Sequence, residues 1–308
     1  MTEMTDKPFR VLLATDDSDA ARSAEAWVSR ARWRRPCEVD VLCVAGYGIT
    51  RIGWSMEGDR SAARQAVEKL REAEVIASER IANAVSLRLQ EAGLKTRALA
   101  RHGDIADEII ATMETERPDI VAVGPRGRSR IAQLFLGSVS RQIIAAARLP
   151  VLVARKPPPD QRALPHSILV LIDGSQAGTW MIDWLSAIGW AQDSEVVLLA
   201  LLGVPPGVEQ DDPELVAQVT ASLRDGASAT LDELAARLGE HISQVELEAK
   251  AGHPVDTALK VAEQRGVDVV VAPQRWGRRG HDPFAEKVAR YAKTSVLMIP
   301  EPSAWHDC

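Results

Sequence analysis

Short apolar runs alternate with longer segments of helical periodicity along both halves of the chain. In the first half, apolar residues three or four positions apart predict helices, among them residues 61–92 and 105–116. The runs between the helices are rich in β-branched residues, which is typical of buried parallel strands. They lie at residues 9–14, 39–45, 94–100, 120–123 and 151–153. This order predicts a doubly wound α/β fold with a five-stranded parallel sheet.

The second half repeats the pattern of the first. Residues 167–178 are similar to residues 10–21, which places Asp173 opposite Asp16. Two later pairs of segments match in the same order, namely 251–272 with 101–123 and 293–300 with 148–155. Three matches in one order indicate a duplication. We therefore predict a first domain at residues 1–155, a proline-rich linker at 156–166 and a second domain at 167–308.

A glycine-rich loop follows the fourth predicted strand of the first half. Gly124, Gly127 and Gly137 lie between this strand and a helix that begins near Ser138. Glycines let backbone amides approach a ligand, and the amino terminus of a helix carries partial positive charge. The loop region has no acidic residue and four basic ones, Arg126, Arg128, Arg130 and Arg141. It indicates a phosphate site; the alternative is a set of tight turns with solvated arginines.

Asp16 directly follows the first predicted strand. If the strands are ordered 3-2-1-4-5, ligands bind where strands 1 and 4 diverge, beyond their carboxyl ends. Asp16 would face the glycine loop there and could accept hydrogen bonds from ribose or adenine. The alternative is helix capping, a role that Asp17 or Ser18 could also take. Together with the loop, Asp16 favours a nucleotide site.

These motifs resemble the universal stress protein family, over residues 9–155 and 167–300. The resemblance rests on Asp16, on Asp173 and on the spacing Gly124-x2-Gly127-x9-Gly137-Ser138, which matches the family's ATP-binding pattern in full. It implies a Rossmann-like fold of the adenine nucleotide alpha hydrolase-like type, with the two domains paired through their fifth strands as a pseudo-dimer. It also implies an ATP site, with or without Mg²⁺. The nucleotide-binding residues are then expected to be Ala14, Thr15, Asp16, Val44, Val123, Gly124, Arg126, Gly127, Gly137, Ser138, Val139 and Ser140.

The second half departs from this pattern after its fourth strand. Pro273 lacks the N–H group that a glycine would offer, and Trp276 is bulky. Asp282 and Glu286 add negative charge near any phosphate. We therefore expect one nucleotide per chain, bound by the first domain, with Asp173 a structural remnant or part of another site.

Composition excludes several other functions. The net charge of −6 and the pI near 5.6 argue against nucleic-acid binding. No apolar run is long enough to span a membrane, and the amino terminus lacks the apolar core of a signal peptide, so we expect a cytoplasmic protein. The cysteines and histidines have no metal-binding spacing. A stripe of apolar residues at 180–188 favours core packing over a partner surface.

The expected role is nucleotide binding rather than catalysis. No Walker A motif and no base beside a nucleophile are present, so at most weak ATP hydrolysis is expected and no catalytic residue is assigned. We predict a nucleotide-dependent stress-response regulator or binding module that acts on a protein partner of unknown identity. The alternatives are a slow ATPase or adenylyl-transferring α/β enzyme, and a nucleotide-free scaffold. The sequence leaves homodimer formation open.

Overall fold

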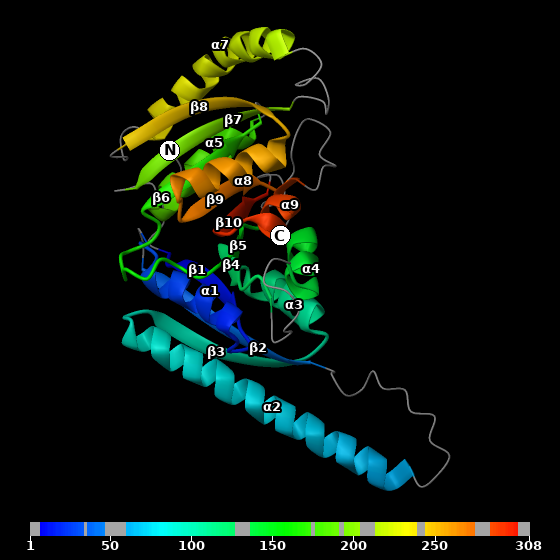
Figure 1. Ribbon diagram of the computed structural model, residues 1–308. Helices are drawn as coiled ribbons and strands as arrows, with labels where there is room; N and C mark the ends of the chain where they lie inside the picture. The colour runs from blue at the N-terminus through cyan, green and yellow to red at the C-terminus, as the bar shows by residue number, and fades with distance from the viewer. Residues whose placement is uncertain are drawn as a thin grey trace.

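The computed structural model describes residues 7–33, 36–46, 60–126, 136–173, 176–190, 194–203, 213–238, 244–274 and 284–300. Strands and helices alternate through both halves of the chain (Figure 1). The first half contains β1 (Phe9–Ala14), α1 (Asp19–Arg30), β2 (Cys37–Gly46), α2 (Arg60–Glu91), β3 (Lys95–Gly103), α3 (Ile105–Glu116), β4 (Ile120–Val123), α4 (Ser138–Ala146) and β5 (Val151–Val153). The second half contains β6 (Ser167–Ile172), α5 (Ala177–Ile188), β7 (Glu195–Gly203), α7 (Pro213–Leu238), β8 (Gln244–Gly252), α8 (Pro254–Arg265), β9 (Val269–Pro273), α9 (Phe284–Tyr291) and β10 (Ser295–Ile299).

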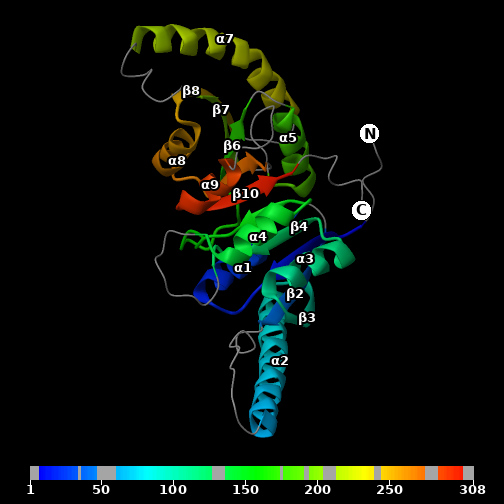
Figure 2. The ribbon, with the colours of Figure 1, turned by 90° about the vertical axis from the view of Figure 1, so that its right-hand side faces the viewer.

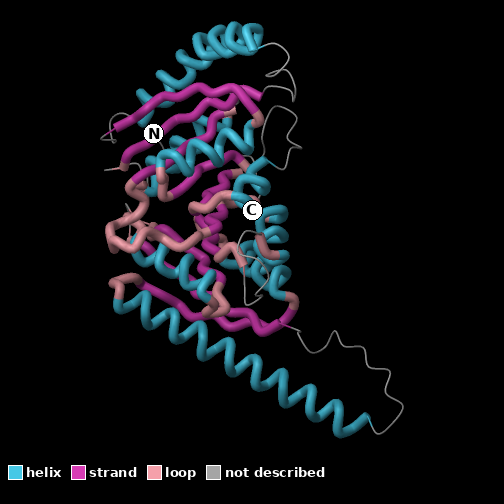
Figure 3. The backbone as a smooth tube through the Cα atoms, viewed as in Figure 1, coloured by secondary structure: helices cyan, strands magenta, loops and turns pink. Residues whose placement is uncertain are grey.

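All the strands in the described residues join one 10-stranded sheet, in the order β3-β2-β1-β4-β5-β10-β9-β6-β7-β8. Each half has the predicted order 3-2-1-4-5 with parallel neighbours. The halves meet where β5 pairs with β10 in the antiparallel direction, with Leu152 opposite Leu297. In Figure 3 the strands, in magenta, run from one half into the other between the helices. The predicted fold and the pairing of the fifth strands are therefore confirmed. The domain boundaries at residues 155 and 167 stay predictions.

Helices cover both faces of the sheet. On β1, Val11 and Leu13 contribute to the core beneath α1, α2, α5 and α7, whereas Leu12 and Ala14 contribute to the core beneath α3, α4, α8 and α9. This alternation follows from the period of two along a strand. Within each half, one pair of helices therefore lies on each face, as Figures 1 and 2 show. Among the described helices, none is both long enough and apolar enough to cross a membrane.

An aromatic cluster joins the two halves on the α1 and α5 face. Trp190, which follows α5, lies 5.7 Å from Trp27 of α1 and 5.9 Å from Trp33, measured between ring centroids. Trp184 of α5 lies 6.2 Å from Phe9 of β1. The apolar stripe of α5 thus packs in a core, as expected, and this core extends into the first half. The junction between the two halves, here called the seam, is consequently closed by these side chains as well as by the backbone pairing of β5 with β10.

Candidate functional site

A tight turn follows β1 and leads into α1. Within it, Asp17 N donates to Thr15 Oγ1 and Ser18 N donates to Asp16 Oδ1, both at 3.1 Å. Ser18 is the N-cap of α1, because its Oγ accepts a hydrogen bond from Ala21 N at 3.3 Å. Helix capping is therefore the role of Ser18, while the Asp16 carboxylate lies at the end of the strand.

An ion-pair network holds this turn against the adjacent helices. Asp17 adopts the left-handed conformation, with φ of 58°, which is unfavourable for a residue with a Cβ. Its carboxylate accepts hydrogen bonds from Arg88 of α2 at 2.8 Å and from Arg22 of α1 at 3.2 Å. Arg88 also forms an ion pair with Glu25. The hydrogen bonds to Glu25, and to a smaller extent the bond to Asp17, raise the pKa of the Arg88 guanidinium. The turn that carries Asp16 is thus fixed from two helices.

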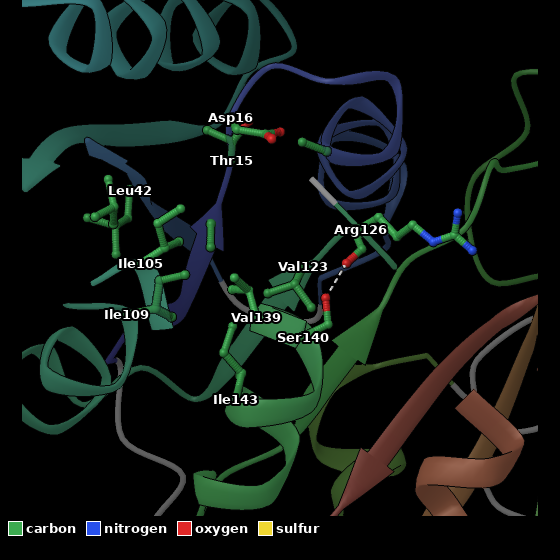
Figure 4. Close-up of a pocket in the computed structure, with 14 residues that line it drawn as sticks. Thr15, Asp16, Leu42, Ile105, Ile109, Val123, Arg126, Val139, Ser140 and Ile143 are labelled. Carbon is green, nitrogen blue, oxygen red and sulfur yellow. Dashed lines mark hydrogen bonds between the residues drawn. The ribbon is translucent and has the colours of Figure 1, made fainter. Parts of the chain in front are cut away.

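The opposite side of the crevice is formed by the end of β4 and the start of α4. Ser140 Oγ donates to Gly124 O at 3.0 Å (Figure 4), and Gly137 N donates to Pro125 O at 2.8 Å. Gly137 is the N-cap of α4 and makes no side-chain cap hydrogen bond. The N-cap residue of α4 therefore offers no side-chain acceptor to the first amides of the helix, which is an arrangement that suits an anion.

Between these two walls lies a pocket with about 570 Å³ of empty space, counting the part open to solvent. Figure 4 shows Asp16 and Thr15 at one end, and Val139 and Ser140 at another. The guanidinium of Arg126 points away from the other pocket residues. The apolar part of the lining comes mainly from Leu42, Val44, Ile105, Ile109, Val123 and Ile143.

The pocket brings together most of the residues that the sequence predicted for the site. Those that line it are Ala14, Thr15, Asp16, Val44, Val123, Gly124, Arg126, Val139 and Ser140. Gly137 and Ser138 lie at the start of α4 and do not line it, and Gly127 lies outside the described residues. The prediction missed Ala21, Leu42, Ile105, Ile109 and Ile143. The position of Leu42 near the carboxyl end of β2 was the available signal, because ligands gather at that edge of the sheet.

Gly124 also has a structural reason to be glycine. A Cβ at this position would lie 2.5 Å from Ala20 O and 2.6 Å from Ala20 C, in the backbone of α1. At Gly137 the nearest atoms, Arg126 Cα and Pro125 O, would be 3.4 Å away, which is an ordinary contact. The lack of a side chain at Gly124 thus lets α1 approach β4, whereas Gly137 has room for a small side chain.

The second half presents different residues at the equivalent edge. When the paired residues Val11–Ile120 and Ile168–Val269 are superposed in register, Pro273 takes the position of Gly124, and Gln274 that of Pro125. Ile172 likewise takes the position of Thr15, whose Oγ1 organises the first turn. Glu286 of α9 pairs with Arg290 at 3.3 Å, while Trp276 and Asp282 lie outside the described residues.

A doubly wound sheet with a crevice between its first and fourth strands defines a class of ligand-binding α/β proteins. Within that class, the chain matches the model of the universal stress protein family twice, over residues 9–155 and 165–300. The chain therefore belongs to the universal stress protein family.

Curated relatives carry the same family name but match over limited lengths. A universal stress protein of Methanocaldococcus jannaschii, MJ0531, is 34% identical over 68 residues, which are 22% of this chain and 40% of the relative. A universal stress protein of Mycobacterium tuberculosis, MT2052, is 28% identical over 174 residues, which are 54% of each. The chain thus spans about half or less of the length of these relatives.

A solved structure agrees over nearly the full length. The universal stress protein of Archaeoglobus fulgidus aligns with a TM-score of 0.63 and 20% identity, covering 95% of this chain and 96% of that one. At this level of identity the likeness supports the fold of the tandem chain.

Proposed function

We propose that this universal stress protein binds one adenine nucleotide in the pocket of its first half and acts as a nucleotide-dependent stress-response module. The observation that carries the proposal is the pocket between β1 and β4, which is apolar at its centre and polar at its ends. Apolar walls such as Leu42, Ile109 and Val123 suit an adenine ring. The Asp16 carboxylate suits the hydroxyl groups of a ribose, because an ionised carboxylate only accepts hydrogen bonds.

We assign the phosphate groups of the nucleotide to the start of α4. Its N-cap residue, Gly137, has no side chain to cap the first amides, and the helix dipole favours negative charge there. ATP is the nucleotide that we propose, and a bound Mg²⁺ would supply charge neutralisation for its phosphates. Within the described residues, no group of three or more histidine, cysteine or acidic side chains is arranged to hold a metal ion by itself. A metal ion would then enter with the nucleotide.

Binding in the first half alone is supported by Pro273 and Ile172, which replace Gly124 and Thr15 in the second half. Proline has no N–H group to donate, and isoleucine has no hydroxyl group to organise the turn that carries Asp173.

Isothermal titration with ATP and Mg²⁺ tests the proposal, with one site per chain as the expected stoichiometry. Val139→Phe places a large side chain in the pocket and should abolish binding, whereas Val75→Phe, on α2 and equally half-buried, should not. Asp16→Asn should weaken binding about tenfold by removing a charged acceptor, and the equivalent Asp173→Asn should leave it unchanged. No heat of binding at millimolar ATP would reject the proposal, and equal effects of the two aspartate variants would reject the choice of domain.

A further inference from the structure

Gln274 connects the second half of the chain to α4 of the first half. It follows β9, and its backbone is held there because Gln274 N donates to Ile299 O at 2.9 Å. From this position its side-chain Nε2 donates to Ile144 O at 2.7 Å and to Ala147 O at 3.1 Å. Both acceptors lie at the carboxyl end of α4, which is beside α9 in Figures 1 and 2. The bond therefore crosses between the halves.

The carbonyl groups at this end of α4 need donors from outside the helix. The last carbonyls of an α-helix have no intrahelical partner, and a side-chain donor is one of the ways to satisfy them. A glutamine amide has two N–H groups, so that Gln274 can serve both carbonyls at once. Gln274 is half-buried, which limits the access of water as a substitute.

One side of α4, from its first turn to Ile143, forms a wall of the pocket. Val139, Ser140 and Ile143 line the pocket, and Ser140 is bonded to Gly124 O. The helix has nine residues, which corresponds to a length of about 13 Å. So short a helix moves as one rigid body, and a displacement at its carboxyl end therefore moves the residues that line the pocket.

A similar bond joins the halves in the opposite direction. Arg155, which follows β5, donates through Nη2 to Ala289 O at 2.8 Å and to Arg290 O at 3.3 Å, near the carboxyl end of α9. Each half thus supplies a residue that caps the last helix of the other half. The pocket described above is lined by α4 and not by α9, so the two caps differ in what they can affect.

We propose that Gln274 is a positioning residue for the pocket of the first half: the second half, through this side chain, holds α4 in the orientation that the bound nucleotide requires. The proposal rests on the function proposed above. It assigns to the strand end that carries Pro273 a role in supporting the neighbouring site.

Two substitutions of Gln274 and one control test this role. Gln274→Glu keeps the shape of the side chain but removes the donor and places a negative charge at the carboxyl end of α4, which is unfavourable. Gln274→Lys restores a donor with a favourable charge. The control, Ser295→Ala, removes another bond across the seam, from Arg155 N to Ser295 Oγ at 2.9 Å, which does not involve α4.

Two readouts are needed, the dissociation constant for Mg·ATP and the hydrogen-exchange rates of the α4 amides without ligand. We expect Gln274→Glu to raise the dissociation constant about tenfold and to speed exchange throughout α4. In Gln274→Lys, the dissociation constant and the exchange rates should both stay within about twofold of the wild-type values. Ser295→Ala should lower the melting temperature without changing either readout. If Gln274→Glu does not fold, Gln274→Met replaces it.

Unchanged affinity and exchange in the Gln274→Glu variant would overturn the proposal. Equal losses in Gln274→Glu and Ser295→Ala would also overturn it, because the effect would then be a general loosening of the seam. If the wild-type protein binds no nucleotide, the proposed function fails, and the exchange rates decide separately whether Gln274 holds α4. Faster exchange of the α4 amides in Gln274→Glu but not in Gln274→Lys would establish that Gln274 holds α4. Exchange rates equal to those of the wild type in both variants would exclude it.

Discussion

Replacing Gly124 by alanine tests why this position is a glycine. The added Cβ would lie 2.5 Å from Ala20 O and 2.6 Å from Ala20 C, so that the start of α1 would have to move. Insertion of a methyl group into a packed site of this kind costs about 1–3 kcal/mol. The matched change, Gly137→Ala, meets no atom closer than 3.4 Å. The backbone at Gly137 has φ of −67°, which alanine also adopts. We therefore expect Gly137→Ala to change the free energy of unfolding of the protein by less than about 0.5 kcal/mol.

Urea unfolding, followed by far-ultraviolet circular dichroism without nucleotide, measures both effects. With a slope of about 3 kcal/mol per molar urea, the Gly124→Ala midpoint should fall by about 0.3–1 M. The Gly137→Ala midpoint should remain close to that of the wild type. A Gly124→Ala protein as stable as the wild type, but with weakened ATP binding, would refute the packing explanation and assign this glycine to the ligand. Equal destabilisation by both changes would refute the contrast between the two positions.

Three further predictions concern stability. Ser18→Ala removes the cap of α1 and should lower the free energy of unfolding by about 1 kcal/mol, measured by urea unfolding. Trp190→Ala removes a side chain with 0% exposure from the aromatic cluster. The free energy of unfolding should fall by about 3–5 kcal/mol in the same assay. The pKa of Cys37 is raised from 9.0 to about 12, chiefly by burial of the thiol and also by the negative charges of Asp119 and Glu38. The folded state therefore favours the neutral thiol, and the stabilisation present below pH 9 is lost as the pH rises towards 12. This loss, at most about 1.4 kcal/mol per pH unit, should be smaller in Cys37→Ala when unfolding is followed across that range.

The periodicity of the chain predicted the fold well because buried parallel strands have a composition of their own. The runs at β1 and β4 are almost purely apolar, and their predicted bounds agree with the structure. The bounds of β2 differ because Cys37 and Glu38, outside the apolar run, still pair with β1. Pairing with a neighbour, rather than composition, decides where such a strand begins.

The pocket could be predicted only in part. Asp16 and Gly124 were identifiable because they follow the first and fourth strands, at the edge of the sheet where ligands bind. Ile105, Ile109 and Ile143 were not, because an isoleucine that lines a pocket has the same helical spacing as one that packs in the core. The packing role of Gly124 was also hidden, since it depends on the distance between β4 and α1.

Contacts between the halves were the least predictable feature. Gln274 is a single polar residue after a strand, and nothing in the pattern around it indicates that its amide reaches Ile144, 130 positions earlier in the chain. The cluster around Trp190 is similar, because its members come from separate helices and loops. Such contacts depend on how two domains pack, which periodicity does not encode.

The antiparallel junction of β5 with β10 has an evolutionary consequence, since both strands belong to one polypeptide. In a dimer of identical subunits, every substitution appears on both sides of the two-fold axis. Here the two sides can differ in sequence, and one has Gly124 where the other has Pro273 followed by Gln274. Two repeats in one polypeptide can therefore take on different roles at the same junction.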